Sequence, residues 1–542
     1  MVPDKLLQRL PYFFLAAVAG IVGLHPIHES DPYWHLMLGR AVLRHGTRIV
    51  PEPTALVDFA PSCIVPEWLW GVSTYLVHGW MGAAGLSVLA ALLAVLSALL
   101  IAGLCRSVAE EQVRRAFWWV TVLVVCAAFH RLRLRPQAAF LCLLPGFLWL
   151  THRYLHRGVH ERRWLSLGIA GTALLWAQLH GSFVLVPALF LIQTLPGARA
   201  RLRPYLRESG PLLVVVFGSL LTGAHGVDLI AYIHGHAAGD ASHFVGDLLA
   251  PTWDSMGATR SPSGAAIWLL WLLSAVGMIL QRRMPLRALA LAILGALLLN
   301  TAQRFVSAAA VLTAPLAVQG AVALYRHLGA ERRAARVLSL CALLPCLGVS
   351  VWTVQWVNGH LGPVGKLGFA DGVFPDRATR FLKGMPEGTA VLTDYPAGAP
   401  LGFHLDGHVR TYVDGRTPLY FDDTDLAVQR EAMQFAPSLR LQVEHFDFRA
   451  AVVRRDSIAC VSLRDTGWTL ATVDPIYSTF VPEVTPETLR GFEPCGPFYL
   501  KRKCPDPSGV DAGIARVARW SEDGFPDHLR AERNLECGGD SR

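Results

Sequence analysis

The chain has 542 residues, of which 53% are hydrophobic and only 17% are charged. Soluble domains usually carry about 25% charged residues, so this composition argues against an ordinary soluble protein. The formal net charge of +8 comes mostly from short arginine-rich loops, which indicates membrane topology and not a nucleic-acid partner.

Long apolar runs fill the chain as far as residue 360. The first run follows Lys5 and Arg9, and no small-x-small cleavage site precedes the polar stretch at 28–31, so we interpret it as a retained helix and not as a signal peptide. We predict about eleven transmembrane helices, several of which need flanking residues to reach the ~20 residues of a full span. They cover 11–27, 82–105, 116–129, 136–151, 164–179, 181–198, 210–224, 264–280, 286–300, 305–325 and 337–357.

Arginine clusters occur in every second loop between these runs, which is the positive-inside pattern. It predicts a multi-pass protein of the cytoplasmic (inner) membrane, with a cytoplasmic N-terminus and an extracytoplasmic C-terminal domain. The inside loops then contain Arg106, Arg114 and Arg115; Arg153, Arg157, Arg162 and Arg163; Arg201, Arg203 and Arg207; Arg282, Arg283 and Arg287; and Arg326, Arg332, Arg333 and Arg336.

The segment 67–80 is the uncertain element of this topology. Counting it as a span would reverse every later loop and place the arginine clusters outside. We therefore predict an interfacial or re-entrant helix, because tryptophans such as Trp68, Trp70 and Trp80 suit the headgroup level.

Polar side chains collect in the turns of the predicted outer face. Arginines there oppose the positive-inside bias, so a carboxylate or an anionic ligand is expected to compensate them. Such a set predicts a cavity in which arginines hold a phosphate and a carboxylate acts as general base. The candidates are Glu29, Asp31 and His35 in the first outer loop, Glu67 at its end, Arg131, Arg133 and Arg135 in one turn, His180 in the second and Arg304 in the third.

Several short motifs in this order resemble the GT-C superfamily of membrane glycosyltransferases, which includes protein O-mannosyltransferases and the aminoarabinose transferases of lipid A. The likeness is to a bacterial subgroup and covers most of the chain, although each motif alone is unspecific. The motifs are Asp31-Pro32-Tyr33-Trp34-His35-Leu36, Gly39-Arg40, His45-Gly46, Pro66-Glu67-Trp68-Leu69, Arg133-Leu134-Arg135-Pro136, His180-Gly181-Ser182 and Asp414-Gly415-Arg416.

The resemblance implies transfer of a sugar from a polyprenyl-phosphate carrier to a lipid, glycan or protein acceptor on the outer face. The superfamily's catalytic acid lies in the first outer loop, so Asp31 is the position that inherits it, with Glu29 second. Some members of the superfamily use a divalent metal and others do not. The Glu29-x-Asp31 spacing resembles a D-x-D metal motif only loosely, so no metal site is predicted and the cofactor stays open. Fold-level analogy does not identify the sugar or the acceptor.

Each candidate also has a structural interpretation. Asp31 could cap a helix that starts at Pro32. The three arginines of the first turn could reach lipid headgroups, and His180 could be a hydrogen-bonded turn residue. Arg304 is the best single phosphate candidate because it interrupts a long apolar stretch. Glu67 ranks after Arg304 as a functional candidate.

From residue 366 onward mixed charge and short apolar runs predict a small α/β domain. We expect helices at 376–383, 422–434 and 439–445 and strands at 389–393, 409–413, 450–453 and 468–473, with the 394–398 loop and the Asp414-Gly415-Arg416 turn as distinctive features. If this domain is outside the cytoplasm, Cys460, Cys495, Cys504 and Cys537 can form disulfides of unknown pairing.

The fold class expected is therefore an all-α polytopic membrane bundle of GT-C type followed by a small extracytoplasmic α/β domain. The predicted domains are a transmembrane domain over 1–360, which includes the outer loop 28–66, an α/β domain over 366–504 and a polar tail over 505–542. The alternatives to a glycosyltransferase are a transporter or polymerase of a polyprenyl-linked glycan and a non-catalytic envelope-complex protein. No convincing internal repeat supports the transporter.

Overall fold

A computed structural model describes residues 4–51, 54, 56, 62–109, 116–128, 133–198, 202–229, 261–281, 285–327, 347–359, 363, 365–412, 414, 433, 436–482 and 495. The chain divides into two compact units. The helix unit contains residues 1–27 and 64–369, and the sheet unit contains residues 28–63 and 370–542.

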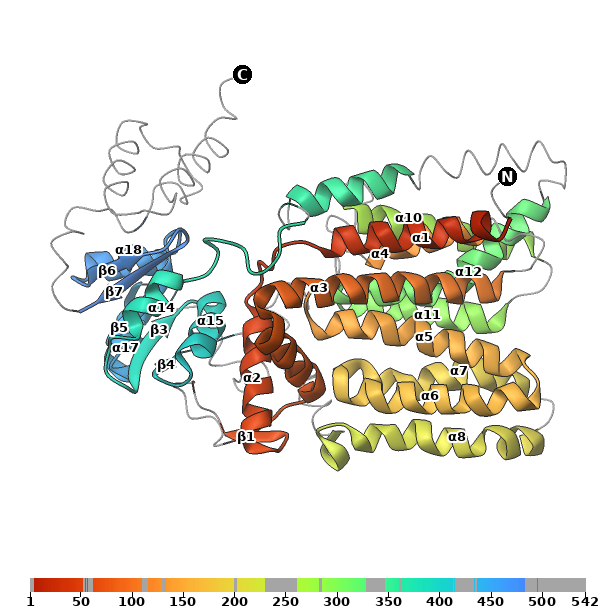
Figure 1. Cartoon of the computed structure of the whole chain (residues 1–542), viewed down its shortest axis with the longest axis horizontal. Helices are drawn as coiled ribbons and strands as arrows, with labels where there is room; N and C mark the ends of the chain where they lie inside the picture. The colour runs from red at the N-terminus through yellow and green to blue at the C-terminus, as the bar shows by residue number, and fades with distance from the viewer. Residues whose placement is uncertain are drawn as a thin grey trace, which may run out of the picture. The chain divides into compact units, whose positions relative to one another are not determined.

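The helix unit is a bundle of apolar helices that run side by side (Figure 1). Each span predicted above coincides with a described helix or with part of one, which confirms the helical class. Four helices within the described residues are long and apolar enough to cross a membrane. The helices are α1 (Asp4–Gly23), α3 (Trp68–Val108), α4 (Ala116–Ala128), α5 (Pro136–His156), α6 (Val159–Leu179), α7 (Val186–Ala198), α8 (Leu202–Thr222), α10 (Pro262–Leu280), α11 (Leu286–Thr301), α12 (Val306–His327) and one over 347–359.

Helix α3 is broken at Gly82, whose φ of 62° lies in the left-handed region. The break separates 68–81 from the remainder of α3 and falls where the sequence divides the predicted interfacial helix from the next span. Glycine suits this position because a side chain is strained at such a φ. The role of 68–81 and the number of spans remain predictions.

Side-chain contacts define two ends of the bundle. At the arginine-rich end, which carries Arg106, Arg153, Arg162, Arg287 and Arg326, His152 of α5 meets the carbonyl of Ser107 in α3 at 3.0 Å. At the other end, called the site end, Gln178 of α6 accepts a hydrogen bond from Trp68 of α3 at 2.8 Å and donates to the carbonyl of Thr222 in α8 at 3.0 Å. The helices differ in direction, so the start of α3 lies beside the ends of α6 and α8 at the site end. The end of α3 lies beside the end of α5 at the arginine-rich end.

Close helix packing in the bundle depends on glycine. A Cβ atom at Gly277 of α10 would meet the backbone of Gly320 in α12, and one at Gly320 would meet the backbone of Leu273. Small residues that let two backbones approach are a common means of association between helices in lipid, where apolar side chains gain little from leaving the solvent.

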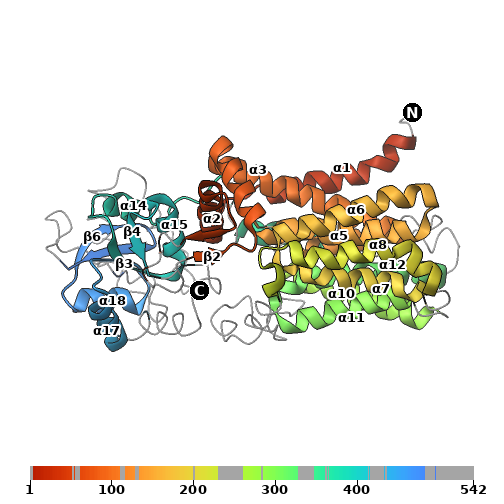
Figure 2. The same ribbon diagram turned by 90° about the horizontal axis from the view of Figure 1, so that it is seen from below.

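The sheet unit contains a five-stranded sheet of order β4-β3-β5-β7-β6. Strands β4 (Val409–Thr411), β3 (Thr389–Thr393) and β5 (Ala450–Arg454) are parallel, while β7 (Tyr477–Val481) and β6 (Thr469–Val473) are antiparallel to their neighbours. Helices α14 (Asp376–Leu382) and α15 (Tyr395–Leu405) cover one face, and α17 (Ala436–Phe446) and α18 (Ile458–Asp465) cover the other (Figure 2). The described residues of this unit therefore form a small mixed sheet with helices on both faces.

Two local predictions for this unit need correction or qualification. The segment 394–398, expected as a loop, starts α15, because Asp394 is the N-cap residue and Pro396 lies in the first turn, where a missing N–H is tolerated. The predicted helix 422–434 and most of the Asp414-Gly415-Arg416 turn lie outside the described residues.

The first outer loop folds with the sheet unit, and the sequence alone did not indicate this. Helix α2 (Asp31–His45) packs on α15. At the edge strand β4, the N–H of Thr411 donates to the carbonyl of Thr54 at 2.7 Å, and the N–H of Leu56 donates to the carbonyl of Thr411 at 2.9 Å. Strands β1 (Ile49–Pro51) and β2 (Ser62–Ile64) form a separate two-stranded sheet. Residues more than 350 positions apart in the chain thus share one unit.

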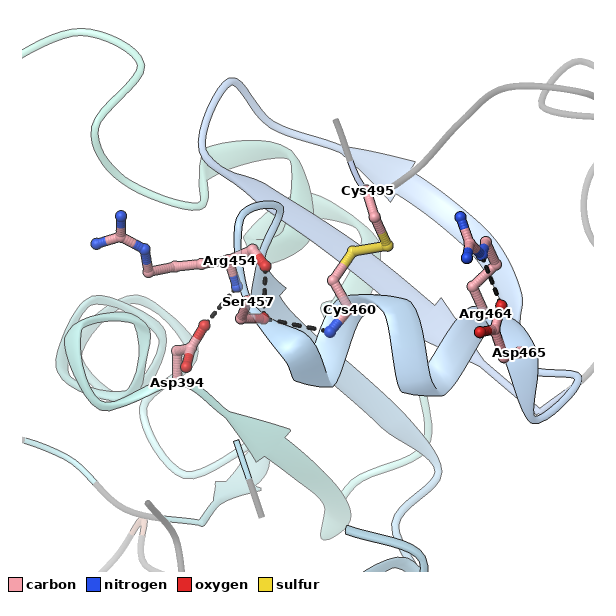
Figure 3. Close-up of a disulfide and its surroundings, with 7 residues drawn as sticks. All are labelled: Asp394, Arg454, Ser457, Cys460, Arg464, Asp465 and Cys495. Carbon is pink, nitrogen blue, oxygen red and sulfur yellow. Dashed lines mark hydrogen bonds and ion pairs between the residues drawn. A yellow bond between two sulfur atoms is a disulfide. The ribbon is translucent and has the colours of Figure 1, made fainter. Parts of the chain in front are cut away.

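A disulfide joins Cys460 at the start of α18 to Cys495 (Figure 3). Nearby, the hydroxyl of Ser457 caps α18 by accepting from the N–H of Cys460 at 3.2 Å. Of the four cysteines named for this domain, these two are therefore the pair that the described structure resolves. Cys105, Cys126 and Cys142 are free and buried in the bundle, as expected for packing residues.

Two buried carboxyls make the stability of the sheet unit depend on pH. Burial raises the pKa of Asp394 to about 6, although the backbone N–H of Arg454 donates to it. Burial also raises the pKa of Asp474 to about 6, although the N–H groups of Arg377 and Ala378 donate to it. Both carboxyls therefore bind a proton more tightly in the folded state than in the unfolded state. Their contribution to the free energy of unfolding is complete below the unfolded pKa and is lost as pH rises through about 6.

We expect the unfolding midpoint of the sheet unit to be higher near pH 5 than near pH 7.5, since each pKa unit corresponds to about 1.4 kcal/mol. Asp394→Asn should reduce this dependence. The measurement is thermal unfolding of the purified full-length protein, with proteolysis reporting the sheet unit. Asp465→Asn, at an exposed site, is the control, and an unchanged pH dependence in Asp394→Asn would contradict the assignment.

Candidate functional site

The proposed general base lies at the start of α2. Asp31 is the first residue of this helix, Ser30 is the N-cap residue, and Pro32 lies in the first turn. The specific expectation that Asp31 caps the helix is therefore wrong by one position. A carboxylate in the first turn still interacts favourably with the helix dipole. Glu29 precedes the helix, and His35 is buried one turn after Asp31 with its ring 3.5 Å from that of Trp34.

Helix α2 is held on α15 by two arginines, a contact that no local sequence pattern indicates. Asp406, which ends α15, pairs with Arg40 at 2.9 Å and with Arg44 at 2.6 Å. Arg40 also donates to the carbonyl of Phe403 at 3.1 Å and lies over its ring at 5.0 Å. These contacts fix the helix whose first residue is Asp31.

Asp406→Asn should loosen this helix. We expect the free energy of unfolding to fall by about 1–2 kcal/mol, because the Asp406 carboxylate forms ion pairs with two arginines. Of these, Arg40 is largely buried and Arg44 is exposed. Thermal unfolding and protease cleavage within 28–63 are the measurements. Asp447→Asn is the matched control, since both aspartates have a positive φ and, within the described residues, Asp447 pairs with Arg449, two residues away, and with no residue of another helix. Equal effects of the two variants would show that the contact does not hold α2.

At the site end of the bundle, Glu67 and His180 come together although more than a hundred residues separate them. The carboxylate of Glu67 accepts from the backbone N–H of Gly181 at 3.4 Å. Trp68, next to Glu67, donates to Gln178, two residues before His180. In the sequence, Gln178 is marked only as a polar residue near the end of an apolar run. No other sequence signal indicates that it contacts α3 and α8.

His180 has a structural role in its turn. Its Nδ1 accepts from the backbone N–H of Ser182 at 3.0 Å and lies 2.7 Å from the Ser182 hydroxyl. The ring stacks on Phe140 of α5 with 5.1 Å between centroids. An amide N–H donates to Nδ1, so the proton of the neutral ring is on Nε2. This geometry agrees with the structural interpretation of His180, and contact with a substrate stays a prediction.

Arg304 lies near His180. It occupies the short helix η7 (Gln303–Phe305) between α11 and α12, and its charge acts on the His180 ring. Its guanidinium carbon is 5.2 Å from the centroid of the Phe305 ring. A guanidinium beside a neutral imidazole provides positive charge without the repulsion that a second cation would add, which suits an anionic ligand.

The arginine turn precedes α5 and therefore belongs to the same end of the bundle. Arg135 is the N-cap residue of α5 in an extended conformation, and its N–H donates to the carbonyl of Arg133 at 2.7 Å. Arg131 lies outside the described residues. Arg133 and Arg135 thus have a placement compatible with the predicted phosphate site, while their ligands remain a prediction.

The candidate residues are divided between the two units. Glu29, Asp31 and His35 belong to the sheet unit, while Glu67, Arg133, Arg135, His180 and Arg304 belong to the helix unit. Within the described part of the chain, no group of three or more His, Cys, Asp or Glu side chains is arranged to hold a metal ion.

Several solved GT-C glycosyltransferases have a similar fold. The oligosaccharyltransferase AglB of Archaeoglobus fulgidus with a tethered acceptor peptide has a TM-score of 0.58 at 12% identity, over 82% of this chain and 69% of that one. ArnT of Cupriavidus metallidurans bound to undecaprenyl phosphate has a TM-score of 0.56 at 12% identity, over 89% and 99%. The mycobacterial arabinofuranosyltransferase AftD has a TM-score of 0.56 at 15% identity, over 88% and 40%.

No protein-family model matches the sequence, and no curated protein matches it either. At these identities the structural likeness defines the fold. The chain has the fold of these GT-C glycosyltransferases, as the resemblance of its motifs implied.

Proposed function

We propose that this protein is a membrane glycosyltransferase that moves a sugar from a polyprenyl-phosphate donor to an acceptor on the outer face of the membrane. The observation that carries the proposal is the GT-C fold shared along 89% of the chain with ArnT, a protein whose structure contains undecaprenyl phosphate. Neighbours with the same fold bind a lipid-linked phosphate or an acceptor peptide. A lipid-linked donor is therefore the class of substrate that the fold favours.

In this proposal Asp31 is the general base. A carboxylate at the start of a fixed helix can accept the proton of an acceptor hydroxyl as its oxygen attacks the anomeric carbon. The bond from that carbon to the lipid phosphate breaks, and the phosphate leaves with the negative charge. Glu29 is the second candidate for the base, and His35, one turn along α2, is a candidate for orienting the substrate.

The proposed binding site for the lipid phosphate is the site end of the helix unit. Arg304 beside the neutral His180 is the main candidate, with Arg131, Arg133 and Arg135 as further donors and Glu67 as the group that orders the turn at Gly181. Guanidinium groups bind phosphate oxygens through charge-assisted hydrogen bonds and stabilise the charge that develops on the leaving group.

The proposed topology places the N-terminus in the cytoplasm and the sheet unit outside it. The disulfide between Cys460 and Cys495 supports this orientation, because disulfides form and persist in extracytoplasmic compartments. The proposed domains stay a transmembrane domain over 1–360, an α/β domain over 366–504 and a tail over 505–542, except that residues 28–63 of the first loop fold with the sheet unit.

Binding of undecaprenyl phosphate tests the donor site. We expect Arg304→Gln to weaken binding about 10- to 100-fold, because a hydrogen bond to a charged group contributes about 1.5–3 kcal/mol. Native mass spectrometry of the purified protein, titrated with undecaprenyl phosphate, measures the affinity. The control is Arg207→Gln, at an exposed position near the start of α8. Unchanged affinity in Arg304→Gln, or no binding by the unmodified protein, would overturn the donor assignment.

A further inference from the structure

A cavity of about 390 Å³ opens at the arginine-rich end of the bundle, away from the site end. It is bounded by the C-terminal parts of α3, α5, α7 and α12 and by the N-terminal part of α11. All of these helices belong to the helix unit. The volume falls in the range of about 300–1,000 Å³ that is typical of small-molecule sites.

One buried polar atom of this cavity lacks a hydrogen-bond partner within the part of the chain that the structure describes. Gln193 of α7 is only 5% exposed, and its Nε2 has no hydrogen-bond acceptor among the described residues. Leaving a buried amide N–H unsatisfied costs about 1–3 kcal/mol. Because Gln193 lines the cavity, a ligand with acceptor oxygens would satisfy this donor.

The remaining polar groups of the cavity favour an anion. Arg287 of α11 lies close enough to His152 of α5 for its charge to act on that ring, and the His152 and His156 rings are 4.4 Å apart. His152 Nε2 donates to the carbonyl of Ser107 at 3.0 Å and His156 Nδ1 to the carbonyl of His152 at 2.7 Å, which holds both rings in place. The described lining contains neither Asp nor Glu, so nothing in it neutralises Arg287.

The other wall of the cavity is apolar. Leucines from three helices form it, together with Val108 and Pro315. A small hydrated anion would gain nothing from this wall, whereas a hydrocarbon chain attached to a phosphate would be buried against it. Basic pockets between transmembrane helices commonly take anionic lipid headgroups. The leucines are Leu104, Leu148, Leu155, Leu286 and Leu291.

We propose that this cavity is a second binding site, separate from the donor site, for the phosphate headgroup of an anionic phospholipid. The headgroup phosphate accepts hydrogen bonds from Gln193 and Arg287, and an acyl chain lies along the leucines. Such a lipid would contact α3, α5, α7, α11 and α12 at the end of the bundle opposite Arg304. Its binding to the folded state alone would stabilise the bundle.

Thermal unfolding of the purified full-length protein in detergent, titrated with dioleoyl phosphatidylglycerol, tests this site. We expect the lipid to raise the unfolding midpoint and the zwitterionic dioleoyl phosphatidylcholine to have little effect. Arg287→Gln and Gln193→Leu should each weaken the apparent affinity for phosphatidylglycerol about tenfold or more. Arg207→Gln, which removes an arginine from the same end but not from the cavity, should leave the affinity unchanged.

Two outcomes would overturn the proposal. Equal phosphatidylglycerol affinity in Gln193→Leu and the unmodified protein would exclude the cavity as the binding site, and this variant remains informative if Arg287→Gln does not fold. Equal stabilisation by inorganic phosphate would identify a soluble phosphate and not a lipid as the source of the anion. Neither result depends on glycosyl transfer, so failure here is distinguishable from failure of the proposed enzymatic function.

Discussion

Asp31→Asn should abolish sugar transfer while the protein still folds. Removing a general base typically costs about 10²–10⁴-fold in rate, because the acceptor hydroxyl must then lose its proton without help. Asparagine keeps the size and shape of the side chain, and losing a first-turn charge costs α2 at most about 1 kcal/mol. The measurement is transfer of a labelled sugar from a polyprenyl-phosphate donor by the purified protein in liposomes.

Glu29→Gln is the matched comparison, since it removes the other carboxylate of the same short segment. We expect it to reduce transfer much less than Asp31→Asn, and Asp31→Glu to keep part of the activity. Normal transfer by Asp31→Asn would exclude Asp31 as the base. Loss of transfer in Glu29→Gln alone would assign that role to Glu29. Unimpaired glycan export by both variants would favour the transporter alternative.

Loss of the disulfide should destabilise the sheet unit strongly. The bond between Cys460 and Cys495 closes a loop with a sequence separation of 35. The chain-entropy model gives a stabilisation of about 4 kcal/mol for a loop of this length, by restricting the unfolded chain. We therefore expect Cys460→Ser to lower the free energy of unfolding of the sheet unit by about that amount, as measured by denaturant unfolding of the purified protein.

A reductant provides the control for this variant. It should destabilise the unmodified protein about as much as the substitution does, and should have no further effect on Cys460→Ser. The double variant Cys460→Ser/Cys495→Ser should match the single one. Wild-type stability in Cys460→Ser, or equal sensitivity of all three proteins to the reductant, would show that this bond does not stabilise the unit.

Most helices of the helix unit and several elements of the sheet unit could be predicted from local pattern, whereas α18 and β7 were not predicted. Apolar runs such as 264–280 and 286–300 became α10 and α11 because the backbone groups of such a run can be satisfied only within a helix when it lies in lipid. Strands β3 and β5 followed from short β-branched runs. Helix α15 was missed, because Pro396, Gly398 and Pro400 lie within it and indicate a loop in sequence.

The candidate site was only partly predictable. Glu67, His180 and Arg304 stand out as polar residues at the ends of apolar runs, and the fold brings them to one end of the bundle. Gln178 was missed because an amide beside an apolar run carries little signal, although it joins α3, α6 and α8. Its role depends on partners that are 110 and 44 positions away.

The sequence by itself determined that much of the chain forms apolar helices suited to a membrane and that its C-terminal side mixes helices and strands, because hydrophobic periodicity is a local property. Only the tertiary structure decided that α2 folds with that domain through Arg40, Arg44 and Asp406, which of the outer cysteines pair, and that Gln193 and Arg287 share a cavity. These contacts join residues that are distant in sequence, and no local pattern predicts which partner each side chain has.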